Sequence, residues 1–398
     1  MKKWVVAAKR ADFNAIAEKY NISPMLARII RNRDVTGDDA ISMYLNGTVK
    51  DMHDAGLLKD IDKAASMILS AVERGGKIFI IGDYDIDGVC SSYILKKGIA
   101  FIGGDVMVRL PDRIKDGYGM NKDMVDEALK WGADMILTCD NGIAANAEIG
   151  YAKERGLAVI VTDHHEVPFT EEDGEKRYVI PCADAVVDPK QEDCGYPYKE
   201  ICGGMVAYKL MQRIFCECDR GEELLSELLM FAGFATVGDV MELKDENRIA
   251  VRFALEYMKT TKNYGMNALI DAVRIDRSSL TPYSIGFILG PCINATGRLD
   301  SAVRALDMFM SGTYEEAFKT AQELKSLNDS RKEMTELYKK QALDMIDKDA
   351  SFKDDRVLIV HLPGCHESLA GIIAGRIRER FYKPVFVLTG EDDSVKGS

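Results

Sequence analysis

The chain has 398 residues, of which 47% are hydrophobic and 29% are charged, and its formal net charge is −12. This length exceeds a single ordinary core and predicts two or three domains, while the hydrophobic content excludes a largely disordered chain. The acidic balance excludes a nucleic-acid partner held by overall charge, so such a partner requires local basic residues or bound cations.

No apolar run approaches the roughly 20 residues that a membrane-spanning helix needs, so we expect no membrane partner. The start of the chain has only a short apolar patch, at 5–8, before Lys9 and Arg10, which argues against a signal peptide. Nine cysteines without a C-x-x-C pair indicate reduced thiols. These features predict a cytoplasmic protein.

From residue 77 the chain alternates short apolar runs with helical patterns. This alternation predicts an α/β fold with a parallel sheet and helices on both faces. Strands are expected at 77–81, 105–110, 134–138, 157–162 and 185–189. The intervening helices are expected at 91–98, 121–132 and 144–155.

The pattern then turns helical, and a second, shorter α/β unit follows. Helices are expected at 203–216, 222–236, 246–261, 266–274 and 283–290, and a long charged helix at 313–349 is typical of a bridge between domains. The second unit has strands at 356–363 and 384–389 around a helix at 368–380, and with about two strands it looks cut short. The predicted domains are 1–310 (with 1–75 as a helical part), a bridging helix at 311–350, and a partial domain at 351–398.

Three aspartates follow the first strand at alternate positions, Asp83, Asp85 and Asp87. In an extended segment such positions share one face, which predicts three carboxylates on one side of the strand exit. Carboxylates packed in this way repel one another unless a cation lies among them. A polar turn after a strand is the alternative for this segment taken alone.

Acidic and imidazole side chains also follow the next two strands of the predicted core. Asp140 follows the strand at 134–138, and Asp163, His164 and His165 follow the strand at 157–162. In an open parallel sheet, ligands gather outside the carboxyl ends of the strands where the strand order reverses, so these side chains are expected to converge. Mixed imidazole and carboxylate ligands suit Mn²⁺ better than Mg²⁺ or Ca²⁺ alone.

Asp239 ends an otherwise apolar helical stretch, where an unpaired carboxylate is costly, and it is a further candidate ligand. A helix-terminal aspartate with its hydrogen bonds satisfied is the alternative.

The strings GDYDIDG (82–88), CDNG (139–142), DHH (163–165) and GD before VMEL (238–243) resemble, in this order, the four motifs of the DHH phosphoesterases. A finer resemblance, to the RecJ group of single-strand-specific DNA exonucleases, extends over essentially the whole chain. It is carried by LPDRIKDGYGM (110–120), DPKQEDCGYPYKEICGGMVAYKL (188–210), DVMELKDENR (239–248), GPCINATGRL (290–299), LNDSRK (327–332) and HESLAGIIAGRIRERFYKPVFVL (366–388).

The resemblance implies a metal centre that binds two divalent ions, Mn²⁺ in preference to Mg²⁺. The implied ligands are Asp85, Asp87, Asp140, His164 and Asp239, with Asp83 as a lesser candidate. Asp140 would bridge the ions, with Asp85 toward one of them and Asp87, His164 and Asp239 toward the other. Pyrophosphatase-type relatives carry a histidine where this chain has Ile81, so the first ion is expected to have fewer protein ligands.

The implied catalytic residues are Asp140 and His165. His165 is expected to contact the phosphate and stabilise charge, or alternatively to support His164 from behind. The implied substrate-binding residues are Arg298, His366, Arg113 and Asn294. Further basic and aromatic candidates, for which an ordinary surface or core role is the alternative, are Lys115, Lys190, Arg331, Lys332, Arg376, Tyr84 and Tyr118.

The resemblance therefore implies a metal-dependent exonuclease that degrades single-stranded DNA, with 5′→3′ polarity, in DNA repair and recombination. A helicase or a single-strand-binding protein is a further implied partner. Two alternatives stay open: a DHH phosphodiesterase for short oligonucleotides or cyclic dinucleotides, and a catalytically silent DHH scaffold that binds nucleic acid. Relatives of the RecJ group continue beyond the position of Ser398, so this chain is expected to keep the metal centre but to bind long DNA poorly.

Overall fold

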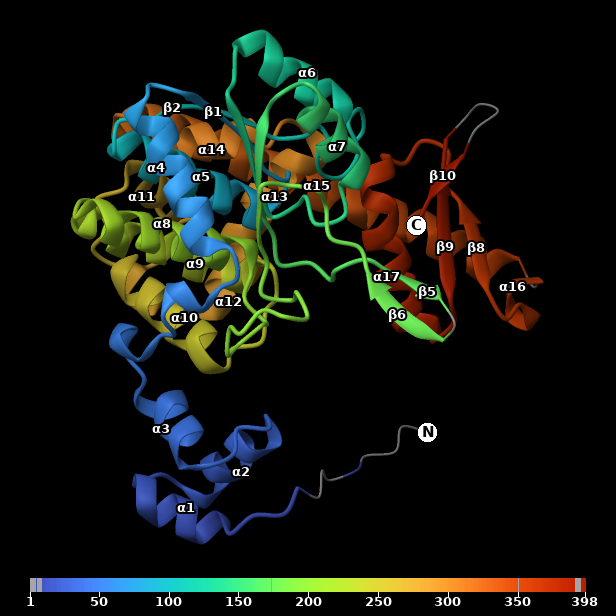
Figure 1. Cartoon of the computed structure of the whole chain (residues 1–398). Helices are drawn as coiled ribbons and strands as arrows, with labels where there is room; N and C mark the ends of the chain where they lie inside the picture. The colour runs from blue at the N-terminus through green and yellow to red at the C-terminus, as the bar shows by residue number, and fades with distance from the viewer. Residues whose placement is uncertain (1–4, 6–8, 173, 350, 391–394) are drawn as a thin grey trace.

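A five-stranded parallel sheet forms the centre of the molecule (Figure 1). The computed structural model describes residues 5, 9–172, 174–349, 351–390 and 395–398. In spatial order the strands are β2 (Asp105–Arg109), β1 (Lys77–Ile81), β3 (Met135–Cys139), β4 (Ala158–Thr162) and β7 (Ala185–Val187). Each neighbouring pair is parallel, which confirms the α/β fold class predicted from the sequence.

Helices cover both faces of this sheet, as the strand sequences predict. Ile78 and Ile80 of β1 belong to one core, and Phe79 and Ile81 belong to another, because successive side chains of a strand point to opposite faces. The first face packs against α4 (Ile61–Glu73), α5 (Ile86–Phe101) and α8 (Gly203–Cys218). The second face packs against α6 (Lys122–Trp131) and α7 (Asn146–Glu154).

The strand order reverses at β1. The chain passes from β1 through α5 to β2 on one side, and it then returns to place β3 on the other side of β1. The carboxyl ends of β1 and β3 therefore lie next to each other at the reversal, which is where open α/β sheets bind their ligands.

A helical layer follows the sheet. It consists of α9 (Leu225–Gly238), α10 (Asp245–Tyr257), α11 (Tyr264–Ala272), α12 (Pro282–Ser284), a π-helix (Ile285–Leu289), α13 (Gly290–Leu299) and α14 (Val303–Met310). The helix expected to stop at residue 290 instead continues to Leu299. Pro291 does not break it, because proline is tolerated in the first turn of α13.

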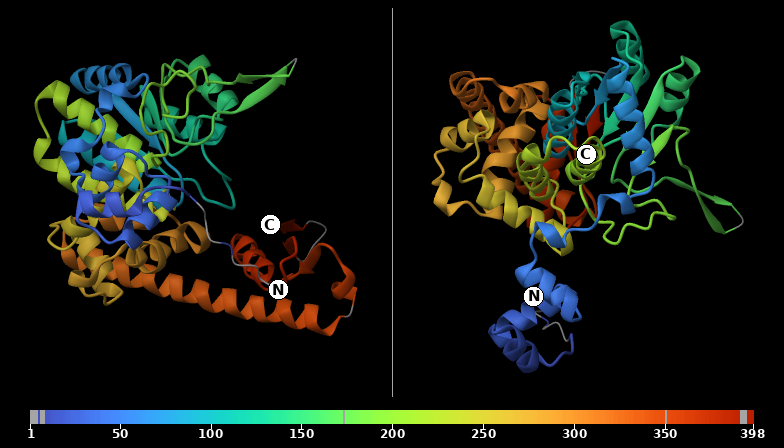
Figure 2. Two further views of the ribbon diagram at one scale, coloured as in Figure 1. Left: turned by 90° about the horizontal axis from the view of Figure 1, so that it is seen from below. Right: turned by 60° about the vertical axis from the view of Figure 1, so that its left-hand side comes forward.

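The long helix α15 (Tyr314–Lys348) connects this layer to the C-terminal unit, as Figure 2 shows in its left view. Its first part packs against α11, α13 and α14, and its last turns share a core with the C-terminal unit. That unit consists of α16 (Ser351–Asp354), β8 (Leu358–His361), α17 (Ala370–Phe381), β9 (Val385–Thr389) and β10 (Lys396–Gly397). The division of the chain into three domains stays a prediction.

Several parts of the fold were not resolved into elements by the sequence patterns, and α4 and α14 are among them. The N-terminal helices α1 (Phe13–Tyr20), α2 (Pro24–Asn32) and α3 (Asp38–Asn46) form a small separate core, below the sheet in Figure 1. A hairpin of β5 (Phe169–Glu172) and β6 (Glu175–Tyr178) projects after β4. Short 3₁₀ turns lie at Val49–Asp51, Ala55–Leu57, Glu222–Leu224, Arg277–Ser279 and Glu367–Leu369.

Within the described ranges, no helix combines the length and the apolar character needed to cross a bilayer. Residues 1–4 and 6–8, which the signal-peptide argument partly uses, lie outside the described residues. All nine cysteines are free thiols.

Candidate metal centre

The segment after β1 brings Asp83, Asp85 and Asp87 to the sheet edge, but not in the extended form that the alternating pattern predicts. Helix α5 begins at Ile86, five residues before the expected start, so Asp87 lies in its first turn. Asp85 is the N-cap, and its Oδ1 accepts hydrogen bonds from the backbone N–H groups of Asp87 at 2.8 Å and Gly88 at 3.1 Å. This cap starts the helix early, so the expectation of three carboxylates on one strand face is wrong.

Asp140 follows β3 with a left-handed backbone, at φ 60°, and its side chain is buried. Such a backbone costs energy for a residue other than glycine and is typical of functional sites. Burial, together with the nearby carboxylates of Asp87 and Asp85, raises the pKa of Asp140 well above its usual value.

The segment after β4 places two imidazoles beside Asp140. The Nε2 atom of His164 lies 3.1 Å from Asp140 Oδ1, 3.4 Å from Asp87 Oδ2 and 3.7 Å from Asp239 Oδ2. Burial lowers the pKa of His164, which favours the neutral imidazole that a metal ion requires. His164 is therefore the meeting point of three carboxylates from three different parts of the chain.

His165 is held from behind by a buried carboxylate. Its Nδ1 lies 2.7 Å from Asp163 Oδ1, and Asp163 also accepts backbone N–H groups from Ile143, His164 and His165. The hydrogen bond to Asp163 raises the pKa of His165 to about 9. Burial opposes ionisation of Asp163, but the same bond to His165 holds its pKa below the usual value. The other ring nitrogen, Nε2, lies 3.1 Å from the Tyr118 hydroxyl.

Asp239 comes from the C-terminal end of α9 and completes the cluster. Burial, followed by the carboxylates of Asp87 and Asp85, raises its pKa to about 7. The next residue, Val240, has φ 59° although its side chain is β-branched and 87% exposed. This left-handed residue ends α9 in a Schellman motif, in which Val240 N–H donates to Val237 O at 3.2 Å and Met241 N–H donates to Thr236 O at 3.1 Å.

Three groups of possible ligand atoms result, each with all its atoms within 4.8 Å of one another. They are Asp83–Asp85–Asp140, Asp140–His164–His165 and Asp87–His164–Asp239. The convergence predicted from the strand ends is therefore present in the structure. Asp140 and His164 each belong to two groups. A carboxylate such as that of Asp140 has two oxygens and could bridge two adjacent ions, whereas His164 Nε2 could bind only one of them.

The electrostatics of the cluster fit divalent metal. Burial and the neighbouring Asp85 raise the pKa of Asp83 to about 7, and its Oδ1 is buried without a hydrogen-bond partner in the described structure. A buried carboxylate oxygen without a partner is costly, and a cation would satisfy it. Oxygen and imidazole ligands together suit Mn²⁺ and similar ions. The assignment of Asp83, Asp85, Asp87, Asp140, His164 and Asp239 as ligands stays a prediction.

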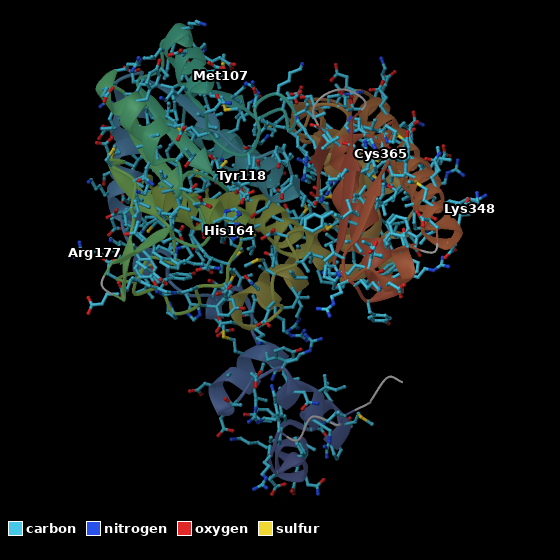
Figure 3. The ribbon with its side chains drawn as sticks, turned by 90° about the vertical axis from the view of Figure 1, so that its right-hand side faces the viewer. Met107, Tyr118, His164, Arg177, Lys348 and Cys365 are labelled. Atoms are coloured by element: carbon cyan, nitrogen blue, oxygen red, sulfur yellow. The ribbon has the colours of Figure 1, made fainter. Side chains whose placement is uncertain are left out.

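The predicted substrate residues lie at two places around the cluster. Arg298 Nη1 donates to the backbone oxygen of Ser368 at 2.9 Å, and His366 Nδ1 lies 2.7 Å from Ser368 Oγ, so Arg298 meets the C-terminal unit there. Arg113 stacks over Tyr84, with its guanidinium carbon 4.9 Å from the ring centroid. Figure 3 shows Tyr118 and His164 close together, with Cys365 on the C-terminal unit across from them.

Asn294 has an evident structural role. Its Oδ1 accepts the backbone N–H of Ile86 at 2.8 Å, which fixes the start of α5 beside Asp85 and Asp87. A contact of Asn294 with substrate stays a prediction. Lys190 forms ion pairs with Glu166 at 2.7 Å and Glu200 at 3.4 Å, and its side chain is only 16% exposed. A role of Lys190 in substrate binding stays a prediction.

The sequence reasoning did not identify what holds Asp87 and His165 in place. Asp87 accepts hydrogen bonds from the backbone of Gly203 and Gly204, and His165 is oriented by Asp163. Two adjacent glycines at the start of an apolar helix were a usable signal for a close approach of that helix.

Comparison with known proteins places these residues in a family. The family model described as "DHH family, N-terminal domain" matches residues 77–235. A crystal structure of exonuclease RecJ bound to manganese superposes with a TM-score of 0.73 and is 30% identical, covering 83% of this chain and 80% of that chain. The chain belongs to the RecJ group of the DHH family. This membership confirms the resemblance on which the ligand assignments rest.

Curated members of the RecJ group match over most of this chain. The single-stranded-DNA-specific exonuclease RecJ of Bacillus subtilis (strain 168) is 33% identical over 399 residues, which are 100% of this chain and 49% of that protein. The RecJ of Escherichia coli (strain K12) is 32% identical over 95% of this chain and 66% of its own length. The chain thus spans about half to two thirds of the length of these relatives. A structure of the Thermus thermophilus RecJ in complex with Mn²⁺ gives a TM-score of 0.77 at 27% identity, covering 95% of this chain and 52% of that chain.

Proposed function

We propose that this chain is a metal-dependent phosphodiesterase that acts as an exonuclease on single-stranded DNA. The observation that carries the proposal is the three overlapping ligand groups, which share Asp140 and His164 at the reversal of the strand order. The relatives that match over most of the chain are named single-stranded-DNA-specific exonucleases, and one is described as bound to manganese. Polarity from 5′ to 3′ and a role in DNA repair and recombination are parts of the same proposal.

The chemistry follows from the residues of the cluster. The residues that would hold divalent ions are Asp83, Asp85, Asp87, Asp140, His164 and Asp239. Such ions, when bound, would supply Lewis acidity to activate a water molecule and to neutralise charge on the phosphate. Asp140 belongs to the ligand group with Asp83 and Asp85 and also to the group with the two histidines, so its carboxylate lies between these groups. His165 presents an imidazole that is kept in one orientation by Asp163, which suits donation of a hydrogen bond to a phosphate oxygen.

Local basic residues answer the objection raised by the net charge of −12. Burial, followed by the neighbouring Arg113 and Arg331, lowers the pKa of Arg298, and burial lowers the pKa of Arg331, with Arg376 adding to it. Arg298 therefore lies near enough to Arg113 and Arg331 for repulsion, and Arg331 near enough to Arg376. An anion such as the phosphate backbone would relieve that repulsion.

Tyr84 and Tyr118 are the residues that we propose for contact with bases. Their rings meet edge to face with centroids 6.4 Å apart, and Tyr118 is 56% exposed. Aromatic side chains beside a basic surface are typical of single-strand binding, where bases stack without regard to sequence. We also propose that the protein acts in the cytoplasm, and a helicase or a single-strand-binding protein as partner stays a prediction.

The test compares a long single strand, the matching duplex and a dinucleotide as substrates, each with Mn²⁺ and with EDTA. The proposal expects stepwise release of nucleotides from the single strand, none from the duplex, and none with EDTA. Cleavage of the dinucleotide alone would instead establish a short-oligonucleotide phosphodiesterase. Binding without any cleavage would establish a silent scaffold. Strands labelled at either end give the polarity.

A further inference from the structure

The buried carboxylate of Asp87 is held by the backbone of a distant helix. Gly203 N donates to Asp87 Oδ2 and Gly204 N donates to Asp87 Oδ1, each at 2.7 Å. These lengths are at the short end for N–H···O bonds, as expected when the acceptor is charged. One carboxylate therefore accepts from two consecutive peptide groups that lie more than 110 residues farther along the chain.

The same two N–H groups open helix α8. Its N-cap residue, Cys202, makes no side-chain capping hydrogen bond, so the first turn has donors that need an outside acceptor. Asp87 is that acceptor, and the helix dipole favours a negative charge at this end. Asp87 thus caps α8 from the first turn of α5.

Glycine is needed at both positions for this approach. A Cβ atom on Gly203 would lie 2.8 Å from Asp140 Cβ and 3.1 Å from Asp87 Oδ2. A Cβ atom on Gly204 would lie 2.9 Å from Ala235 Cβ and 3.2 Å from Asp87 Oδ1. Either side chain would push the start of α8 away from Asp87, and at position 203 it would also displace Asp140.

The two hydrogen bonds from Gly203 and Gly204, called the clamp below, leave Asp87 able to bind metal. Each carboxylate oxygen has two lone pairs, and the N–H groups take one of each, so lone pairs remain on the side of His164. Asp87 Oδ2 lies 3.4 Å from His164 Nε2, in the group completed by Asp239. A ligand whose orientation is fixed before metal binds loses less freedom on binding, and partners of this kind tune metal affinity.

We propose that Gly203 and Gly204 are positioning residues of the metal centre, which act by letting the first turn of α8 fix the carboxylate of Asp87 toward His164 and Asp239. This inference rests on the metal assignment in the proposed function. We expect the larger effect on metal binding at position 203. A side chain there disturbs two predicted ligands, Asp87 and Asp140, whereas a side chain at 204 disturbs Asp87 alone.

The first experiment measures Mn²⁺ binding to the full chain by calorimetry, for wild type and for Gly203→Ala and Gly204→Ala. We expect binding to weaken by about 10- to 100-fold, more for Gly203→Ala, with the rate at saturating Mn²⁺ largely restored. Gly150→Ala is the matched control, since it is also helical and a Cβ there meets nothing within 4 Å. Alanine favours helix over glycine, so helix propensity alone predicts no loss in any of the three.

Hydrogen exchange keeps the test decisive if a glycine variant fails to fold. In metal-free Asp87→Ala, the amides of Gly203 and Gly204 should lose protection, whereas in metal-free Asp239→Ala they should keep it. Unchanged exchange in Asp87→Ala, or wild-type Mn²⁺ affinity in folded Gly203→Ala and Gly204→Ala, would overturn the positioning role. If wild type itself binds no Mn²⁺, the proposed function fails instead, and the exchange result still reports on the clamp.

Discussion

Repulsion among the clustered carboxylates should destabilise the metal-free protein. The substitution Asp239→Asn, which removes one of these charges, tests this. Burial and the nearby Asp87 and Asp85 hold the pKa of Asp239 at about 7, against an ordinary value of 3.8. The difference of about three pKa units corresponds to at most about 4 kcal/mol of destabilisation once the group is ionised. Sharing of protons within the cluster and the imperfect fit of an amide reduce the expected gain to about 1–3 kcal/mol.

The effect of Asp239→Asn on the stability of the metal-free protein depends on pH. Below pH 4 the carboxyl is protonated in both the folded and the unfolded states, so the substitution changes little. As pH rises from about 4 to about 7, the unfolded chain loses this proton first, so stability falls. Above pH 7 the full cost is present. Metal-free Asp239→Asn should therefore be more stable than wild type at pH 8 and no more stable at pH 4.

Bound metal should make wild type more stable than Asp239→Asn at pH 8, the reverse of the order expected without metal. With saturating Mn²⁺ at pH 8, wild type gains stability from a ligand that binds only the folded state, and the variant, lacking one ligand, gains less. Urea unfolding at pH 4 and pH 8, with EDTA or Mn²⁺, measures all of these differences. Asp105→Asn, at an exposed position of β2, is the control. A metal-free Asp239→Asn that is less stable than wild type at pH 8 would refute the electrostatic account of the cluster.

Four further substitutions test separate parts of the structure. Asp140→Ala should abolish Mn²⁺ binding and hydrolysis while circular dichroism shows an intact fold, and activity near wild type would remove Asp140 from the site. Asp163→Asn should lower kcat by about 10- to 100-fold with a smaller effect on Mn²⁺ affinity in calorimetry, because it releases His165; an unchanged kcat would contradict that role. Lys209→Met should cost about 3–5 kcal/mol in thermal unfolding, because it strands the buried carboxylate of Glu246, 2.8 Å from the ammonium; a loss below 1 kcal/mol would contradict it. Arg298→Ala should raise KM for single-stranded DNA with unchanged Mn²⁺ affinity, and an unchanged KM would exclude a substrate contact.

The sheet and the meeting of its strand ends were predictable from the sequence because both follow from local patterns. Apolar runs such as 77–81 and 157–162 mark buried parallel strands, and chain order with the rule on strand reversal brings Asp140 and His164 together. Asp239 was a candidate because it ends an apolar helical stretch, but only the family resemblance connected it to the strand ends, since no spacing argument links the end of α9 to the sheet.

Other features depend on tertiary contacts that a sequence pattern does not contain. The spacing of Asp83, Asp85 and Asp87 suggests a strand, but the cap formed by Asp85 starts a helix and sends Asp87 to a different ligand group. The link from Asp87 to Gly203 joins segments that only the folded chain brings together. The hairpin at 169–178, by contrast, was missed although its sequence holds a local signal, because the dipeptide Asp173-Gly174 is typical of a two-residue hairpin turn.

The most direct test of the central claim is anomalous scattering from crystals of this chain grown with Mn²⁺. The account predicts two peaks, roughly 3.5–4 Å apart, with Asp140 contacting both and His164 and Asp239 on the side of Asp87. No peak within this cluster, or peaks bound by residues elsewhere in the molecule, would contradict it.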